Sequence, residues 1–367
     1  TNNKVVVVYN DPSNSQFGAT IVGTVSGTSI SFEAEIVFNA AVTYYNAATY
    51  DSTNNKVVIG FRDAPAVPGG GVAVTLTVGS TNNTDFVGIT DEAISSAASG
   101  SVIVQGGVGT GVSLPYPLIV GAPVIFEAAA TYSTATVFDS NSNKVVISYR
   151  DVGNSSYGTS VVGTVSGTTI TFGTPVVFET ASVNHLRATF DSTSNKVVIV
   201  YSDTGNSSYG TAIVGTVSGT SISFGTAVVY NSSGISDSGV TFDSTNNKVV
   251  IAYQHNTNSN YGTAIVGTVS GTAISFGTDV VFETASVASV AATFDSANNK
   301  VVIAYKDEGN SSYGTAIIGT VSGTAISFGT AAVFEAASTT YITATFDSNA
   351  NKVAIAYKDN GTTYGTA

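Results

Sequence analysis

The stretch Phe294-Asp295-Ser296-Ala297-Asn298-Asn299-Lys300-Val301-Val302-Ile303-Ala304-Tyr305 decides the fold, because close copies of it recur along the chain. The triplet Phe-Asp-Ser occurs five times at a spacing of 52 residues, with its aspartate at Asp139, Asp191, Asp243, Asp295 and Asp347. A fixed period of this size indicates a repeat architecture. The constancy of the copies indicates a common scaffold.

Within one repeat, from Val287 to Glu335, apolar and polar residues alternate, which is the pattern of half-buried strands. Four strands, A to D, are predicted at Val290–Phe294, Lys300–Lys306, Tyr313–Val321 and Ala325–Phe334. The segments between them are rich in Asp, Asn, Ser and Gly, which favour turns. A lone four-stranded sheet cannot bury both of its faces, so each repeat must pack against its neighbours.

The sequence therefore predicts an all-β fold, a β-propeller of four-stranded antiparallel blades. The motif Asn-Lys-Val occurs seven times, which suggests about seven blades; its lysines are Lys4, Lys56, Lys144, Lys196, Lys248, Lys300 and Lys352. Six or eight blades, or an open array, are alternatives. The first copy lacks strand A and the last lacks strand D, so the ends do not close a ring by simple complementation.

We treat residues 1–367 as a single repeat-built domain with one irregular interval. From Lys56 to Lys144 the spacing is 88 residues instead of 52. The amino-acid sequence of residues 81–123 does not match the repeat. This segment is expected to be either a degenerate blade or an inserted β-rich module.

Composition excludes several classes of function. The formal net charge is −12 and only 10% of residues are charged, so no basic stripe is available for nucleic acid. No run of 18 apolar residues occurs, which argues against membrane insertion. The chain has no Cys, and hence no disulfide and no thiolate metal site. Its first residues are not a signal peptide, and we expect a processed chain or a fragment.

A catalytic site would require polar residues at positions where the sequence departs from the repeat, and few such residues occur. The only histidines are His185 and His255, and no Ser/His/Asp grouping or pair of carboxylates can be nominated. His255 replaces the aspartate that follows the strand-B tyrosine elsewhere and is interpreted as a drifted loop residue. No cofactor is expected, and the enzyme hypothesis ranks below binding.

The loop from Tyr201 to Tyr209 contains Asp-x-Gly-x-Ser before an aromatic residue, which resembles the Asp box of sialidases and other propellers. The aromatic residue comes one position later than in that pattern. The resemblance implies that the aspartate holds a turn. Asp151, Asp203 and Asp307 are thus expected to be structural, with calcium binding as the alternative.

A sialidase would also bring three arginines together around a carboxylate, as that resemblance implies. The chain has three arginines in all, Arg62, Arg150 and Arg187. Arg62 and Arg150 occupy the same repeat position, just after the strand-B aromatic residue, and are interpreted as drift. A sialidase site is therefore not predicted.

The repeats diverge mainly in the connection from strand D to the next strand A. In a propeller this connection lies on the same face as the B-to-C loop, around the central channel. A constant scaffold with variation on one face is typical of a binding surface, and relaxed selection in exposed loops is the alternative. The predicted ligand-binding residues are Tyr44, Tyr45, Tyr132, Asn184, His185, Arg187, Asp237 and Tyr341.

The phrase Asn-Lys-Val-Val-Ile-Ala-Tyr (299–305), with Tyr-Gly-Thr-Ala-Ile-Val-Gly-Thr-Val-Ser-Gly-Thr-Ser-Ile-Ser-Phe-Gly-Thr (209–226), resembles repeat arrays in virion structural proteins of marine bacteriophages and in bacterial surface proteins. This resemblance covers most of the chain. Residues 86–102 are similar to a segment of phage tail and capsid-associated proteins. The resemblance implies an appendage or fibre component that displays a propeller toward a host, and it carries over no catalytic residue.

Three hypotheses follow. The first is a non-enzymatic protein of a virion or an extracellular surface, which binds host glycan or protein through the variable connections and contacts other structural proteins. The second is a purely structural repeat spacer without a ligand. The third is a glycan-cleaving propeller enzyme.

Overall fold

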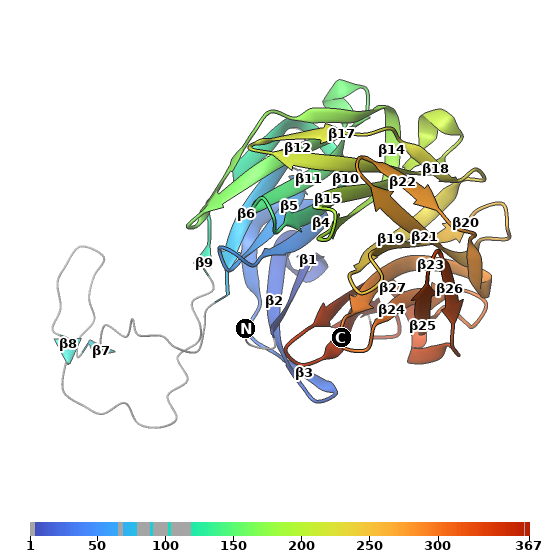
Figure 1. Ribbon diagram of the computed structural model, residues 1–367. Coiled ribbons are helices and arrows are strands. Elements are labelled where there is room, and N and C mark those ends of the chain that lie inside the picture. Colours follow the sequence, from blue (N-terminus) through green and yellow to red (C-terminus); the bar gives the residue numbers. More distant parts are fainter. Residues whose placement is uncertain (1–3, 65–68, 79–88, 91–101, 104–118, 363) are drawn as a thin grey trace.

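The computed structural model describes residues 4–64, 69–78, 89–90, 102–103, 119–362 and 364–367, which form almost entirely antiparallel strands (Figure 1). The helical segments of this part are three short 3-10 turns, η1 (Pro12–Asn14), η2 (Val152–Asn154) and η3 (Thr204–Asn206). No helix among these residues is long and apolar enough to span a membrane. The prediction of an all-β chain is confirmed.

The four-stranded repeat is present in the predicted order. Strand B of one unit, β24 (Lys300–Asp307), lies between the end of β23 (Val280–Asp295) and β25 (Tyr313–Ser322). Strand β25 then pairs with β26 (Ala325–Phe328) and with the start of β27 (Ala332–Asp347). Strand D, which was predicted as one strand from Ala325 to Phe334, is thus divided into β26 and the start of β27. All pairings are antiparallel, as expected of a meander.

Strand D of one unit and strand A of the next form one continuous strand, which corrects the prediction of a loop between them. In β14 (Val176–Asp191) the first half pairs with strand C of its own unit, up to Ser182 opposite Tyr157. The second half pairs with strand B of the next unit, from Val183 opposite Asp203. A continuous strand gives its backbone groups partners on both sides of the junction, which a loop would leave to water. We call these segments crossing strands.

The same pattern runs through the chain. Strands of type B are β1 (Lys4–Asp11), β5 (Lys56–Asp63), β11 (Lys144–Asp151), β15 (Lys196–Asp203), β20 (Lys248–His255), β24 and β28 (Lys352–Asp359), seven among the described residues, one for each Asn-Lys-Val copy. Strands of type C are β2 (Phe17–Ser26), β6 (Gly70–Thr77), β12 (Tyr157–Ser166), β16 (Tyr209–Ser218), β21 (Tyr261–Ser270), β25 and β29 (Gly365–Thr366).

The outer parts of strand D are β3 (Ser29–Phe32), β9 (Ile119–Val120), β13 (Thr169–Phe172), β17 (Ser221–Phe224), β22 (Ala273–Phe276) and β26. The crossing strands are β4 (Ile36–Asp51), β10 (Val124–Asp139), β14, β23 and β27, while β18 (Val228–Asn231) and β19 (Ile235–Asp243) are one such strand interrupted at 232–234. This interruption divides the described strands into a 16-stranded and an 11-stranded sheet, beside the small pair β7 (Ile89–Thr90) and β8 (Val102–Ile103).

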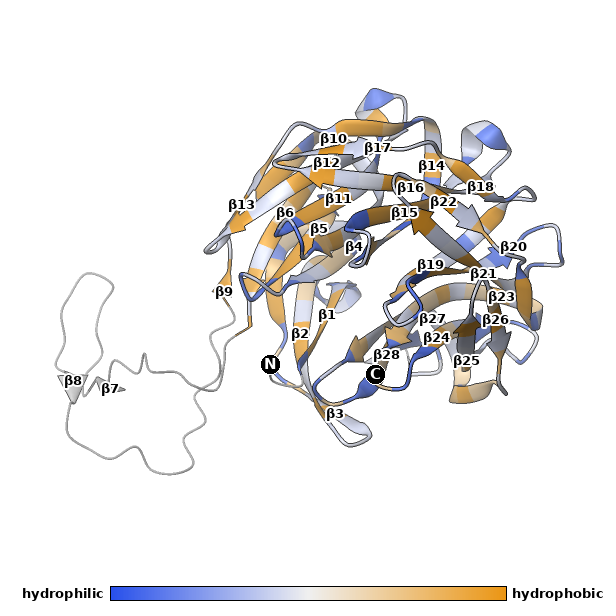
Figure 2. Cartoon of the chain, in the orientation of Figure 1, coloured by the Kyte–Doolittle hydropathy of each residue, from blue (hydrophilic) through white to orange (hydrophobic). Residues whose placement is uncertain are grey.

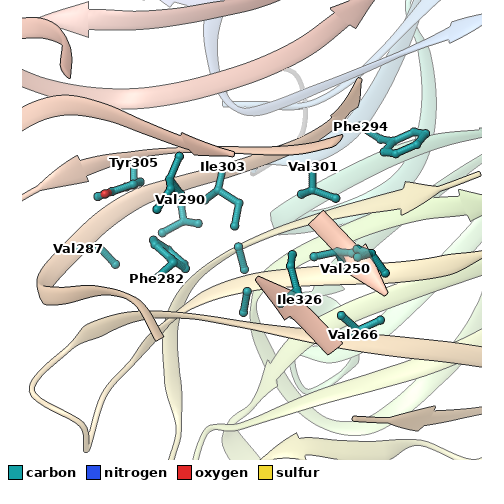
Figure 3. Packing of buried hydrophobic residues seen from close by; sticks show 14 residues of the cluster. Val250, Val266, Phe282, Val287, Val290, Phe294, Val301, Ile303, Tyr305 and Ile326 are labelled. Carbon is teal, nitrogen blue, oxygen red and sulfur yellow. The ribbon is translucent and has the colours of Figure 1, made fainter. Parts of the chain in front are cut away.

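The hydrophobic core is divided into clusters that lie between consecutive units. The cluster in Figure 3 joins Val250 and Val266 of one unit to Val301 and Ile303 of the next. In Figure 2 hydrophobic residues follow the strands, while hydrophilic residues gather at the turns. Each unit therefore buries its sheet faces against its neighbours, as the repeat pattern predicted.

The units follow a curved path that brings the first and last units together (Figure 1). Val5 of β1 and Val25 of β2 share a buried cluster with Ala354 of β28. Strand β28 pairs with β29 only through Tyr357 and Lys358. Hollows of about 390 and 350 Å³ lie beside β28, one toward β25 and one toward the β2–β3 hairpin. The contact between the ends is made by side chains, without a shared strand.

In four of the units a tyrosine of strand B donates a hydrogen bond to strand D of the unit before it. Tyr201 is fully buried, donates a hydrogen bond of 2.9 Å to Glu179 and packs its ring against Phe178. The same hydrogen bond from a tyrosine hydroxyl to a glutamate carboxylate joins Tyr149 to Glu127, Tyr305 to Glu283 and Tyr357 to Glu335. Burial, and secondarily the Glu179 carboxylate, raises the pKa of the Tyr201 hydroxyl far above its ordinary value.

The irregular segment predicted at residues 81–123 lies largely outside the described residues. Strands β6 and β10, on either side of it, pair with each other, and β6 also pairs with β9. The described strands on either side of the segment are thus strands C and D of a single unit.

Candidate functional site

The variable position of each crossing strand is a β-bulge. At equivalent places the register of pairing shifts and one residue takes a left-handed backbone, with φ between 47° and 55° at Tyr45, Ser133, His185, Ser289 and Tyr341. A non-glycine residue in this conformation costs roughly 1–2 kcal/mol. The chain keeps this backbone while the side chain changes from tyrosine to serine to histidine.

The bulges share one face with the B-to-C loops, as predicted. The N–H of Val287, beside the bulge of β23, donates to the carbonyl of Asn260 in one B-to-C loop at 3.0 Å. The N–H of Glu308, in the next B-to-C loop, donates to the carbonyl of Ser286 at 2.9 Å. The bulges of β4, β23 and β27 are each fixed in this way by the loops of two consecutive units, which holds their side chains at rigid positions.

Three of the predicted tyrosines form one aromatic group. The ring of Tyr45, on β4, lies 5.2 Å from that of Tyr132, on β10, and 6.4 Å from that of Tyr44, measured between centroids. Tyr44 and Tyr45 are 39% and 44% exposed, although large aromatic side chains are ordinarily buried more completely. The group therefore offers apolar ring surface to a ligand at the junction of two units.

Two arginines complete this group. Arg62 lies opposite Tyr44 in the β4–β5 pairing, and Arg150 lies opposite Tyr132 in the β10–β11 pairing. Their guanidinium carbons are 4.4 and 4.6 Å from the centroid of the Tyr132 ring, within cation–π distance. We call Tyr44, Tyr45, Tyr132, Asn184, Arg62 and Arg150 the rim cluster.

Asn184 extends the rim cluster into the next unit. Its side-chain oxygen accepts a hydrogen bond of 2.5 Å from Arg150. Gly69, whose φ is +75°, lies against Arg62, because a Cβ at this glycine would be 2.4 Å from the arginine Nε. Arg150 is therefore held by a hydrogen bond, while Arg62 packs between Gly69 and the Tyr132 ring.

A second group follows along the same face. Arg187 and Asp237 form an ion pair of 3.7 Å, and Asp237 also accepts a hydrogen bond of 3.2 Å from the N–H of Val290. Burial lowers the pKa of His185, and Arg187 acts in the same direction while Asp237 opposes it. Neutral His185 can donate or accept a hydrogen bond at near-neutral pH.

The last predicted residue stands apart. Tyr341, at the bulge of β27, is 80% exposed, and its side chain has no ring contact or hydrogen bond with any described residue. The eight predicted residues are thus divided into the rim cluster, the group of His185, Arg187 and Asp237, and an isolated tyrosine.

Sequence reasoning missed Arg62 and Arg150, which it interpreted as drift. A signal was available, because both residues immediately follow the strand-B aromatic residue, and that position lies opposite Tyr44 or Tyr132 in the variable connection. The register of strand pairing, which places each arginine opposite a tyrosine, could not be predicted from a single sequence.

The aspartates that resemble an Asp box hold turns, as expected. Asp203 accepts hydrogen bonds from the N–H groups of Gly205 and Asn206 at 3.0 and 3.2 Å, and Asp307 does the same with Gly309 and Asn310. Asp151 accepts one from Asn154, and burial raises the pKa of its carboxyl group. His255 occupies the equivalent place, and its Nδ1 accepts a hydrogen bond from the N–H of Asn258 at 3.3 Å.

Replacing Asp203 by alanine is expected to destabilise the protein by about 1 kcal/mol, since two backbone N–H groups lose their acceptor. Asp203→Asn keeps one acceptor oxygen and should cost less than half as much. The free energy of unfolding in urea measures both effects. An unfolding midpoint that rises with added calcium in the wild type but not in Asp203→Ala would instead assign the loop to metal binding. Among the described residues no group of three or more His, Asp and Glu side chains could hold a metal ion.

Comparison with known proteins places the fold but not the family. No family model matches the chain, and no curated protein matches it. Among solved structures, the BP39L lectin of Burkholderia pseudomallei is similar over 100% of this chain and 98% of its own, with a TM-score of 0.55 at 11% identity. A protein of unknown function from Dyadobacter fermentans is similar over 87% of this chain and 90% of its own, with a TM-score of 0.53 at 10% identity. At these identities the likeness concerns the all-β fold alone.

Proposed function

We propose that the chain is a β-propeller of about seven blades that binds a host glycan through the bulges on one face. The observation that carries this proposal is the rim cluster, in which exposed tyrosines and fixed polar groups from consecutive units meet on a constant scaffold. Tyrosine rings with adjacent hydrogen-bonding groups suit sugars, which have apolar ring faces and many hydroxyls.

Two observations support the propeller. Consecutive four-stranded units bury a core between them, and the first and last units meet at Val5 and Ala354. The likeness to the BP39L structure extends over almost the whole of both chains. That protein is named a lectin, which agrees with a glycan as the ligand.

The location proposed is a virion appendage or an extracellular surface, where the protein displays the bulges toward a host and contacts other structural proteins. The support is the resemblance of the repeats to those of phage virion proteins and bacterial surface proteins. The protein is proposed to be non-enzymatic and to need no cofactor. Turnover of a panel of fluorogenic glycosides by the purified chain would contradict this assignment.

A glycan array followed by calorimetry with the retained glycans tests the proposal. Tyr132→Ala should weaken binding about 10-fold or more, because it removes a ring at the centre of the cluster. Tyr50→Ala is the matched control. Tyr50 is 48% exposed and also lies on a crossing strand, β4, but near the end of that strand and away from its bulge. Equal affinities of the two variants, or no retained glycan, would overturn glycan binding at this cluster.

The second candidate is a structural spacer, and the constancy of the repeats favours it. Units that differ little from one another and bury a core between them can form a rigid array without a ligand. A mass that increases with concentration in light scattering, together with an array without signal, would favour this candidate.

A further inference from the structure

We propose that the rim cluster recognises an acidic oligosaccharide, with Arg62 and Arg150 binding sugar carboxylates such as those of uronic or sialic acids. This inference rests on the proposed function and specifies its class of ligand. It starts from the distribution of positive charge in a chain whose net charge is −12.

The twelve cationic residues fall into two sets. One set consists of the seven lysines that begin the strands of type B. The other set contains the remaining five, which lie at the opposite end of strand B or beside the bulge: Arg62, Arg150, Arg187, Lys306 and Lys358. An eight-residue strand separates its first and seventh residues by about 20 Å. Every positive charge outside the repeated motif, including all three arginines, is therefore on the face of the bulges.

Three of these five cations, Arg62, Arg150 and Lys358, have no ion pair with a described residue, and only the two arginines belong to the rim cluster. Arg187 pairs with Asp237 at 3.7 Å and Lys306 with Glu308 at 3.0 Å. No described carboxylate lies within 4.0 Å of Arg62 or Arg150, and the Nε atoms of both are buried without a hydrogen-bond acceptor.

The nearest aspartates in the sequence do not fill this role. Asp63 and Asp151 directly follow the two arginines, so their side chains leave the strand on its other face. Asp151 is engaged by the N–H of Asn154, and Asp63 by the side-chain amide of Asn39. A guanidinium group keeps its charge at any physiological pH, so an external anion is the remaining way to neutralise this pair.

The geometry suits a sugar that carries a carboxylate. Both guanidinium groups lie within 4.6 Å of the centroid of one ring, Tyr132, and so at most about 9 Å from each other. A guanidinium group can bind a carboxylate through two parallel hydrogen bonds. The exposed rings of Tyr44 and Tyr45 are beside them and can stack on the pyranose ring. A neutral sugar would use the rings but leave the two charges unpaired.

The test is an array of oligosaccharides of galacturonic, glucuronic and sialic acid, each printed beside its methyl ester, with sulfated and neutral glycans on the same slide. Acid and ester differ in charge and hardly in shape. The full chain should bind an acid at least about 10-fold more tightly than its ester. Raising NaCl from about 50 to 300 mM should weaken binding of the acid and leave the ester nearly unchanged.

Calorimetry with the best acid then tests the residues. Arg62→Gln and Arg150→Gln should each reduce affinity for the acid about 10-fold or more and for the ester less than about threefold. Arg62→Lys keeps the charge but loses the paired hydrogen bonds, and it serves as a second variant if Arg62→Gln folds poorly. Lys144→Gln removes a cation at the other end of the strand that carries Arg150, and it should bind as the wild type does.

The possible failures are distinguishable. Equal binding of acid and ester, with loss in Tyr132→Ala, would overturn the acidic ligand and leave glycan binding intact. Binding of sulfated glycans but not of carboxylates would overturn the assignment to carboxylates. A slide without any signal would overturn the proposed function, and the acidic ligand with it.

Discussion

Gly225→Ala is expected to destabilise the protein by on the order of 3 kcal/mol, because the added methyl group has no room between two units. Gly225 follows β17, and a Cβ built on it would lie 1.9 Å from the backbone carbonyl oxygen of Thr272, in the turn before β22 of the next unit. Backbone cannot rotate away as a side chain can, so the two units must separate. The free energy of unfolding from urea titration measures the loss.

The chain contains its own control for this effect. Gly329 occupies the same repeat position in the sixth unit, where the nearest atom to a built Cβ is the Ile318 carbonyl oxygen at 3.9 Å. Gly329→Ala should therefore change stability by less than about 0.5 kcal/mol. An equal decrease in the free energy of unfolding for Gly225→Ala and Gly329→Ala would contradict this explanation, because it would show that the added methyl group destabilises its own unit and not the contact between units.

Unfolding at high pH is the second large effect expected. Tyr149, Tyr201, Tyr253 and Tyr305 are fully buried, and burial raises the pKa of each hydroxyl well above its ordinary value near 10. Below pH 10 these tyrosines are neutral in both states and stability is unaffected. Above pH 10 the unfolded chain releases protons that the folded chain retains, so stability should fall by about 1.4 kcal/mol per pH unit for each tyrosine.

Tyr201→Phe isolates one of these contributions. The variant loses the hydrogen bond to Glu179 and should be less stable at pH 8, but its stability should fall less steeply above pH 10 than that of the wild type. Urea titrations at pH 8, 10, 10.5 and 11 give the slope. A slope that does not change in the variant would mean that Tyr201 does not resist ionisation in the folded state.

The sequence predicted the repeat unit well because its signals are local. The alternation of Val and Ile in strand B, the turn aspartates and the period of 52 residues each depend on neighbours in the chain. The prediction failed at the junction between strands D and A, where Ser and Thr around the bulge were interpreted as a loop. Continuous pairing of both halves with different partners is a long-range property, and a local pattern does not contain it.

The candidate site was predicted in part for the same reason. Tyr44, Tyr45, Tyr132 and Asn184 were identified because they vary while the repeat is constant, and three-dimensional contacts join them. Arg62 and Arg150 were set aside, although both lie against Tyr132. Their importance arises from pairing across strands and from contact across units, neither of which follows from spacing alone.

By itself, the sequence determined that this chain is an array of small antiparallel sheets with one variable position per repeat, because periodicity and turn chemistry act over a few residues. Only the tertiary structure decided that the variable position is a rigid bulge, that two arginines share one tyrosine ring, and that the first unit meets the last. These features depend on the register between strands and on the curvature that accumulates from unit to unit, and both arise from packing between residues that are far apart in the chain.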